Sequence, residues 1–325
     1  MVATSEKAHE IADNGAFVRQ KNRFTTPFGS SETLRFWNNV FDDDDPGGFL
    51  PVETGRYRLI AAKICPWAQR QLIALRLLGL SEGKTPAVGI GIVNPIRTEQ
   101  GWEFSLDPGG LDPVLGIRYL SEAYIKADPL YAGRATVPAV IDITTGKVVN
   151  NDYHRLSNYW ETVWKPFHKP DAPDLYPETL RARIDALNKE IFLKLNNGVY
   201  RAGFAQTQEA YNEAYNDVFE ELDKLEDRLA GKKFLFGEKI TDTDIRLYVT
   251  LARFDIAYHT AKKCNRNRLI DFPNLWRYAK DLYHIPAFKE STDFEHIKRG
   301  YHLGSPERNP YQLLPLGPDL SIWDE

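Results

Sequence analysis

Apolar and polar residues follow regular patterns only from Tyr57 onward, after a first segment that is polar and rich in turn-forming residues. Short apolar runs between turn residues predict buried strands, whereas apolar positions every three or four residues predict amphipathic helices. By these rules we expect strands at 57–64, 87–93, 136–142 and 146–149, and helices at 66–78, 117–128 and 151–164. This order places a parallel strand–helix–strand half before a hairpin and a closing helix.

The second half of the chain is predicted to be helical throughout. A segment with four prolines, 165–178, separates the two patterns and is interpreted as a linker. Beyond it, apolar spacing predicts helices at 211–231, 240–258 and 273–284. Thr241 and Asp244 have the spacing of a capping box at the start of the second of these helices. The proline-rich end, 308–325, is expected to pack on a surface formed by the other helices.

These patterns define the fold class as an α/β N-terminal domain with a thioredoxin-like order of elements, followed by an all-α domain. A chain of 325 residues is longer than one hydrophobic core usually serves, so two domains are expected. We predict an N-terminal extension, a thioredoxin-like domain, a linker, and an all-helical domain with a C-terminal extension, at residues 1–50, 51–164, 165–178 and 179–325.

Composition excludes several classes of partner. A net charge of −4, with basic residues scattered along the chain, argues against nucleic-acid binding, which needs a basic face. No apolar run approaches membrane-spanning length, and the first residues lack the apolar core of a signal peptide. Two cysteines in so long a chain cannot form a disulfide framework. We therefore expect a cytoplasmic protein with neither nucleic-acid nor membrane partners.

No metal site is expected. None of the seven histidines pairs with a cysteine or another histidine at the short spacing of a zinc site. The four aspartates Asp42–Asp45 lack the ligand spacing of a calcium loop. A solvated acidic loop is therefore the favoured interpretation of these aspartates.

Cys65 lies where the first predicted strand passes into the first predicted helix, and Pro66 follows it. Unpaired N–H groups and the helix dipole stabilise negative charge at a helix N-terminus, so a thiolate there is favoured. Proline suits this position, where its missing N–H is not needed. The alternative is an inert, buried cysteine, which is a common fate of free cysteines. Ala68 stands where a second cysteine of a C-x-x-C motif would lie, so any disulfide chemistry must use a thiol from solution. Cys264 is assigned to structural packing.

Two further segments could hold a small peptide. In a thioredoxin-like order, Pro138 takes the position of a cis proline that faces the cysteine, although chance alone predicts a trans bond. A cis bond there leaves the backbone of Val137 free to pair with an extended ligand. Asn151, Asp152 and Tyr153 at a helix N-terminus could bind the charged ends of that ligand. Simple helix capping is the alternative for them.

The chain resembles the xi-class glutathione transferases, also called glutathionyl-hydroquinone reductases. The resemblance extends over nearly the whole chain from about residue 24, and its most telling motifs are "CPWA" and "NGVYRAGFA". It also rests on the segments 65–70, 133–142, 196–211, 241–255, 263–283 and 295–301.

The resemblance implies a glutathione site, a catalytic cysteine and a homodimer. The family's cysteine corresponds to Cys65 and its cis proline to Pro138, while its glutathione-contacting tryptophan corresponds to Trp102. Its two substrate-side tyrosines correspond to Tyr200 and Tyr301. One departure concerns the glutathione carboxylate and amine site, where the family usually has Glu-Ser and this chain has Asp152 and Tyr153.

Three functions are compatible with these residues. The first is reduction of a glutathionyl-hydroquinone through a Cys65–glutathione mixed disulfide, with Tyr200 and Tyr301 assisting protonation of the ring and glutathione as the co-substrate. The second is an omega-like thioltransferase or dehydroascorbate reductase, which needs Cys65 but neither tyrosine. The third is a non-catalytic binding protein of the same fold, with Cys65 inert and Tyr153 blocking the ligand. Both tyrosines have a structural alternative as helix residues with a bonded hydroxyl.

Overall fold

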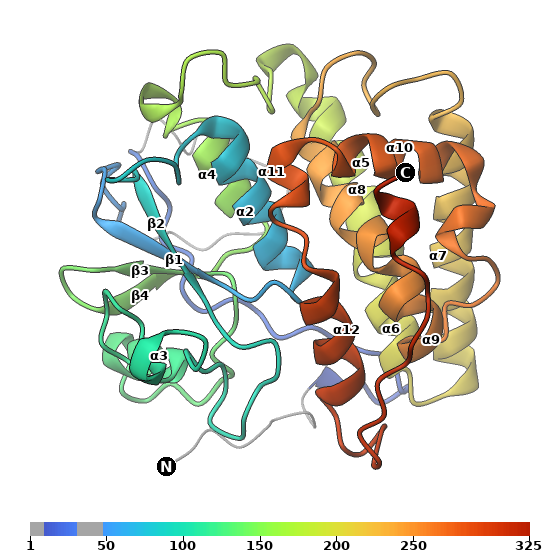
Figure 1. Ribbon diagram of the computed structural model, residues 1–325, viewed down its shortest axis with the longest axis horizontal. Coiled ribbons are helices and arrows are strands. Elements are labelled where there is room, and N and C mark those ends of the chain that lie inside the picture. Colours follow the sequence, from blue (N-terminus) through green and yellow to red (C-terminus); the bar gives the residue numbers. More distant parts are fainter. Residues whose placement is uncertain (1–9, 31–47) are drawn as a thin grey trace. The chain divides into compact units, whose positions relative to one another are not determined.

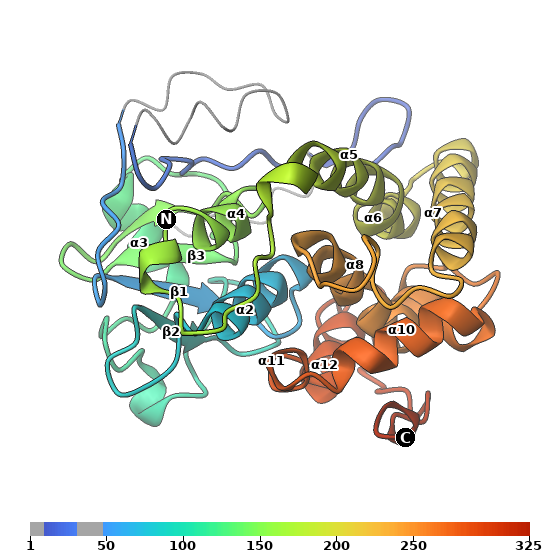
Figure 2. The ribbon, with the colours of Figure 1, turned by 90° about the horizontal axis from the view of Figure 1, so that it is seen from above.

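The computed structural model describes residues 10–30 and 48–325, which form two compact units (Figures 1 and 2). The first unit contains residues 21–30 and 48–174, and the second contains residues 10–20 and 175–325. The division after Asp174 falls inside the proline-rich segment 165–178. The acidic segment Asp42–Asp45 and His9 lie outside the described residues.

A mixed four-stranded sheet forms the centre of the first unit. Its strands are β1 (Tyr57–Ala61), β2 (Val88–Ile92), β3 (Ala139–Asp142) and β4 (Lys147–Asn150), in the spatial order β2-β1-β3-β4. β1 pairs in parallel with β2 and antiparallel with β3, which in turn pairs antiparallel with β4. All five residues of β1 are buried, as expected for an inner strand covered on both faces.

The helices of the first unit are α2 (Pro66–Leu78), α3 (Leu120–Ala127) and α4 (Leu156–Glu161). Figure 1 shows α2 and α4 together beside the sheet and α3 apart from them. The indole Nε1 of Trp160 donates a hydrogen bond of 3.0 Å to Gln71 Oε1 and so joins α4 to α2. The predicted order of elements and the thioredoxin-like fold class are confirmed.

One helix begins later than its pattern predicts. Residues 151–164 were expected to be helical, but α4 starts only at Leu156. The carboxylate of Asp152 accepts a hydrogen bond of 3.1 Å from the N–H of His154, and the N–H of Tyr153 donates to the carbonyl of Asn151. An aspartate that bonds the backbone two residues ahead stabilises a turn in place of helix, so the segment before Leu156 is a turn.

The second unit is a bundle of helices (Figure 2). Its helices are α5 (Arg181–Ile191), α6 (Gly198–Phe204), α7 (Gln208–Arg228), α8 (Asp242–Arg253), α9 (His259–Ala261), α10 (Pro273–Tyr283), α11 (Pro286–Lys289) and α12 (Phe294–Leu303). Every residue of α8 is buried, so this helix forms the core of the bundle. The predicted helices at 211–231, 240–258 and 273–284 correspond to α7, α8 with the turn after it, and α10. Within the described residues, no helix combines the length and apolar character that crossing a bilayer requires.

Short segments from both chain ends pack on the helical unit. The carbonyl of Gly15 accepts a hydrogen bond of 2.9 Å from the N–H of Gln206, and the Phe17 ring lies 5.1 Å from that of Phe204. At the other end, Trp323 packs its indole 4.9 Å from that of Trp276. The C-terminal segment therefore lies on the helices, as its composition predicts.

A buried carboxylate fixes the start of α8. Asp244 is fully buried and accepts hydrogen bonds from the N–H of Leu235, from the N–H and hydroxyl of Thr241, and from the hydroxyl of Tyr278, over 2.7 to 3.0 Å. Burial raises the pKa of this carboxyl group, while the four hydrogen bonds act in the opposite direction. The capping interaction predicted from Thr241 and Asp244 is thus present within a larger network.

We expect Asp244→Ala to lower the free energy of unfolding by about 3 kcal/mol or more, because it leaves several buried donors without an acceptor. Urea denaturation followed by circular dichroism measures this change. Asp281→Ala is the matched control, since the ion pair of Asp281 with Arg277 is half exposed and contributes less than about 1 kcal/mol. Equal effects of the two substitutions would contradict the role assigned to Asp244.

Candidate functional site

Cys65 is the residue immediately before α2. Its backbone is extended, with φ −79° and ψ 119°, and its N–H donates a hydrogen bond of 2.8 Å to the carbonyl of Ala62. Pro66 is the first residue of the helix, and the first turn contains no acidic side chain. The thiol is partly exposed. A thiolate at this position is favoured by the positive end of the α2 dipole and meets no carboxylate within the first turn.

The segment before β3 lies against this cysteine. The peptide bond between Val137 and Pro138 is cis, as predicted, and the Cys65 thiol donates a hydrogen bond of 3.4 Å to the carbonyl of Val137. No described residue accepts a hydrogen bond from the Val137 N–H. That donor is therefore available to the backbone of an extended ligand beside the sulfur.

Asp152 and Tyr153 lie in the turn before α4. The carboxylate of Asp152 is buried, accepts from Asn22 Nδ2 at 3.3 Å and lies 4.0 Å from Arg155 Nε. The ring of Tyr153 packs 5.2 Å from that of Trp67, two residues after Cys65. The α2 terminus and the predicted peptide-binding turn thus belong to one cluster of side chains.

Trp102 lies in the segment between β2 and α3. Its indole is nearly buried and contacts the guanidinium of Arg97, 5.5 Å from the ring centroid. Among the described residues, none of its interactions reaches Cys65. The structure therefore does not join Trp102 to the other predicted glutathione residues, and its role stays a prediction.

In the helical unit, both predicted tyrosines belong to a cluster of three. The hydroxyls of Tyr200 on α6 and Tyr301 on α12 are 2.5 Å apart, and each lies 3.2 Å from the hydroxyl of Tyr258. Tyr258 is fully buried, and burial together with the two neighbouring phenols raises its pKa well above the usual value. Tyr258 is therefore a hydrogen-bond donor, not an anion, at neutral pH.

Three mutually bonded hydroxyls can share a negative charge. If Tyr200 or Tyr301 gives up its proton, the remaining two phenols can both donate hydrogen bonds to the phenolate. The arrangement thus suits a group that transfers a proton and then carries a charge in a water-poor environment.

Tyr258 was not predicted, although it is the last residue of the expected helix at 240–258. It ends a π-helical turn, Phe254–Tyr258, and a second π-helical turn, Phe192–Asn196, precedes the helix that carries Tyr200. Such turns re-aim side chains and occur often at functional sites, but they leave no clear pattern in a sequence. Helical spacing alone therefore could not place Tyr258 beside the other two tyrosines.

Cys264 has the opposite environment to Cys65. It is completely buried, and burial raises the pKa of its thiol to about 12. A thiol with this pKa is almost entirely protonated at neutral pH, so Cys264 fits the structural role expected for it.

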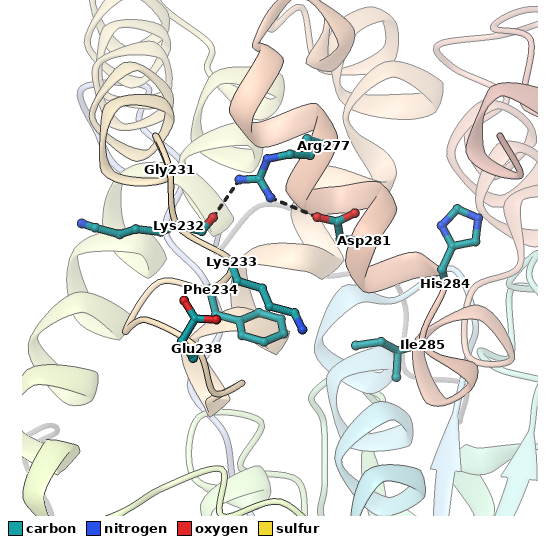
Figure 3. A pocket seen from close by; sticks show the side chains of 9 residues that line it. All are labelled: Gly231, Lys232, Lys233, Phe234, Glu238, Arg277, Asp281, His284 and Ile285. Atoms are coloured by element: carbon teal, nitrogen blue, oxygen red, sulfur yellow. Dashed lines mark hydrogen bonds and ion pairs between the residues drawn. The ribbon is translucent and has the colours of Figure 1, made fainter.

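The helical unit also has an open surface depression of about 850 Å³ (Figure 3). Its lining residues are Gly231, Lys232, Lys233, Phe234, Glu238, Arg277, Asp281, His284 and Ile285. The guanidinium of Arg277 donates to Asp281 at 3.0 Å and to the carbonyl of Lys232 at 2.8 Å, as the dashed lines show. Arg277 is already bonded, and none of the predicted site residues lines the depression. We therefore assign no catalytic or binding role to the depression. Nor do the described histidines, cysteines and carboxylates form any group of three or more that could hold a metal ion.

The fold is that of a glutathione transferase. The family model for the glutathione S-transferase C-terminal domain matches residues 208–281. The chain is 39% identical, over 89% of its own length and 88% of the other's, to glutathionyl-hydroquinone reductase YqjG of Escherichia coli (strain K12).

Solved structures agree with this classification. The xi glutathione transferase of Phanerochaete chrysosporium superimposes with a TM-score of 0.83 at 38% identity, covering 95% of this chain and 94% of that one. The glutathione-bound structure of YqjG superimposes with a TM-score of 0.80 at 36% identity, covering 96% of both chains. The chain belongs to the xi-class glutathione transferases, the family of the glutathionyl-hydroquinone reductases.

We expect iodoacetamide at pH 7 to alkylate Cys65 in the folded protein and to leave Cys264 intact, because only Cys65 is partly exposed at a helix N-terminus. Mass spectrometry of tryptic peptides should find one labelled cysteine in buffer and two in urea. Cys65→Ser should abolish labelling in buffer. Slow labelling of Cys65, at the rate of an unperturbed thiol, would mean that the helix N-terminus does not activate it.

Proposed function

We propose that the protein is a glutathione-dependent reductase that removes glutathione from glutathionyl-hydroquinones through a mixed disulfide on Cys65. The observation that carries this proposal is the hydroxyl cluster of Tyr200, Tyr258 and Tyr301. Cleavage of a bond between sulfur and an aromatic carbon requires a proton at that carbon, and simple disulfide exchange does not.

The first half of the reaction transfers the glutathionyl group. The Cys65 thiolate attacks the sulfur of the substrate, a sulfur–sulfur bond forms, and the bond between sulfur and the ring carbon breaks. The electron pair of that bond stays on the carbon, which takes a proton from the hydroxyl of Tyr200 or Tyr301. The ring is thereby reduced to the free hydroquinone, and the sulfur is oxidised to the mixed disulfide.

The second half restores the enzyme. A second glutathione attacks the mixed disulfide, which releases oxidised glutathione and the Cys65 thiolate. The proton that this glutathione loses returns to the tyrosinate. Ala68 stands where the second cysteine of a C-x-x-C motif would lie, and Cys264 is completely buried, so the second thiol must come from solution.

Glutathione is assigned to the side chains around Cys65. The N–H and carbonyl of Val137, held by the bond to Pro138, pair with the cysteinyl backbone of the tripeptide. The carboxylate of Asp152 pairs with its α-ammonium group, and the turn at Tyr153 receives the neighbouring carboxylate. Trp102 is assigned a contact with the same molecule. Family resemblance supports this assignment, together with the Val137 N–H, for which no described residue is an acceptor.

The cellular setting follows from the same chemistry. A cycle that consumes a reduced thiol and leaves Cys65 free needs a reducing compartment, so we place the protein in the cytoplasm. A homodimer is proposed from the family resemblance.

We expect Tyr200→Phe and Tyr301→Phe each to lower kcat on a glutathionyl-hydroquinone by roughly 100-fold, a usual size for the loss of a general acid. Reduction of a simple glutathione mixed disulfide should change less than about twofold, because that reaction needs no proton at carbon. Cys65→Ser should abolish both activities and is the control for the site.

Two outcomes would contradict the proposal. Unchanged reductase activity in both tyrosine variants, with full mixed-disulfide activity, would favour an omega-like thioltransferase. If the unmodified protein reduced neither a glutathionyl-hydroquinone nor a simple mixed disulfide, a non-catalytic binding protein would be favoured.

For the glutathione site, we expect Asp152→Asn to raise the KM for glutathione by roughly tenfold or more, since a charge-assisted bond to the ammonium group is lost. The asparagine still accepts from the His154 N–H, so the turn should persist. Asp152→Glu keeps the charge and should retain most of the affinity. An unchanged KM in Asp152→Asn, measured by steady-state kinetics, would remove Asp152 from the site.

A further inference from the structure

Two cations lie over the ring of Tyr200. The guanidinium carbon of Arg19 is 4.9 Å from the ring centroid, and the ammonium nitrogen of Lys262 is 5.4 Å from it. Arg19 comes from the N-terminal segment, where its Nε donates a hydrogen bond of 3.0 Å to Asn197 Oδ1. Lys262 follows α9. Two segments far apart in the sequence thus bring positive charge to one phenol of the cluster.

Lys262 is an unusual lysine. Its side chain is 3% exposed, and no described carboxylate forms an ion pair with it. Its ammonium nitrogen lies 3.5 Å from the ring centroid of Phe204, the helical neighbour of Tyr200. Burial, and then the positive charges of Arg308 and Arg19, lower its pKa well below the usual value. A buried ammonium group without an anionic partner among the described residues is costly to keep charged, and this cost is the main reason for the lowered pKa of Lys262.

The chain also leaves room for this lysine. A Cβ on Gly203 would lie 2.1 Å from Lys262 Cδ, so any residue larger than glycine there would push the lysine stem aside. Gly203 lies inside α6, where alanine would favour the helix. Glycine at this position therefore serves the path of the lysine side chain.

Cations over an aromatic ring distinguish the two states of a tyrosine. They are attracted to the negative face of a neutral phenol, and more strongly to a phenolate, whose charge is partly spread over the ring. The two cations therefore stabilise tyrosinate relative to tyrosine. The hydroxyls of Tyr258 and Tyr301 favour the same state by donating hydrogen bonds to the phenolate oxygen.

We propose that Arg19 and Lys262 are positioning residues that stabilise the tyrosinate formed when Tyr200 gives its proton to the ring carbon of the hydroquinone. The proposal rests on the proposed function for the step itself. In that step the proton passes from the Tyr200 hydroxyl to carbon, and the negative charge that stays on Tyr200 lies beneath the two cations. Tyr200 is then the proton donor, and Tyr301 assists the step by donating a hydrogen bond to the tyrosinate.

The two cations differ in how they respond to pH. The groups that face Tyr200 are Arg19 from the N-terminal segment, Tyr258 from the π-helical turn, Tyr301 from α12 and Lys262 from the segment after α9. Arg308, from the segment after α12, faces Phe204 at 4.6 Å. Arginine keeps its charge at all working pH values, whereas Lys262 loses its charge as the pH rises through its lowered pKa. The contribution of Arg19 should therefore persist at alkaline pH, and that of Lys262 should disappear.

The first experiment measures the phenol directly and needs no catalysis. 3,5-Difluorotyrosine, which ionises at lower pH than tyrosine, replaces Tyr200 in the full-length protein, and its ionisation is followed by ultraviolet absorbance. We expect its pKa to rise by about one unit in Arg19→Gln and in Lys262→Met. Arg19→Gln retains a donor for Asn197, and Arg19→Lys should restore the lower pKa.

Two further variants separate charge from structure. Gly203→Ala displaces the lysine stem without removing its charge, and it should raise the pKa of the fluorinated tyrosine in the same direction as Lys262→Met. Arg308→Gln removes a cation that lies over Phe204 and not over Tyr200. Because Arg308 lowers the pKa of Lys262, its removal should keep Lys262 charged and should not raise the pKa of the fluorinated tyrosine.

The second experiment measures kcat across pH with the natural Tyr200. At neutral pH, Arg19→Gln should lower kcat on a glutathionyl-hydroquinone by about tenfold, the kinetic equivalent of one pKa unit. The defect of Lys262→Met should shrink toward alkaline pH, while that of Arg19→Gln should remain. For reduction of a simple glutathione mixed disulfide, kcat should be the same in both variants as in the unmodified protein.

The outcomes are distinguishable. An unchanged pKa of the fluorinated tyrosine in Arg19→Gln, Lys262→Met and Gly203→Ala would overturn the inference, whatever the enzyme does. A shifted pKa in a protein without reductase activity would overturn the proposed function and leave the stabilisation of the tyrosinate established. Equal loss of both activities in Arg19→Gln would assign Arg19 a merely structural role and overturn its part in the step.

Discussion

Polar groups that are buried among apolar side chains must find partners, and both units of this protein depend on that constraint. In the first unit, Arg58 of β1 and Asp112 form an ion pair of 2.8 Å with Asp112 almost completely buried. The pair holds the long segment between β2 and α3, which carries Trp102. In the second unit, Asp244 collects four donors at the start of α8, which is the helix that leads to Tyr258. The segments that carry Trp102 and Tyr258 are therefore held by buried polar contacts.

In the two candidate clusters, different groups are expected to stabilise negative charge. For Cys65, we propose that the dipole at the beginning of α2 stabilises the charge of a thiolate. Around Tyr200, side chains take this role, with two phenols and two cations from different parts of the chain. A nucleophile that must be ionised before reaction suits the first arrangement. A proton donor that becomes charged only during reaction suits the second, because buried phenols stay neutral until then.

Features that depend on local spacing could be predicted from the sequence. The strands and helices of the first unit and the capping residues Thr241 and Asp244 follow from patterns a few residues long. The cis bond before Pro138 follows from the thioredoxin-like order of those elements. The start of α4 could not be predicted, because the choice between turn and helix depended on whether Asp152 bonds the backbone of His154.

Contacts between residues far apart in the chain leave no local pattern in the sequence, so they could not be predicted from it. Tyr258 joins the other tyrosines through a π-helical turn, and Arg19 reaches Tyr200 from 181 positions earlier in the chain. The position of Lys262 could not be predicted either, since a lysine beside polar neighbours in the sequence is normally expected at the surface. Family resemblance compensated for part of this by pointing to Tyr200 and Tyr301, but it did not identify the residues around them.

The division of the N-terminal segment limits how this protein could exchange its domains with relatives. Residues 10–20 belong to the helical unit, although they precede the thioredoxin-like domain in the chain, whereas residues 21–30 belong to that domain. A chimera made with one crossover after Asp174 would take Arg19 from one parent and Tyr200 from the other. Two crossovers, near residue 20 and near residue 174, are needed to move the helical unit intact. For recombination, the helical unit therefore consists of two separate stretches of sequence, with the thioredoxin-like domain between them.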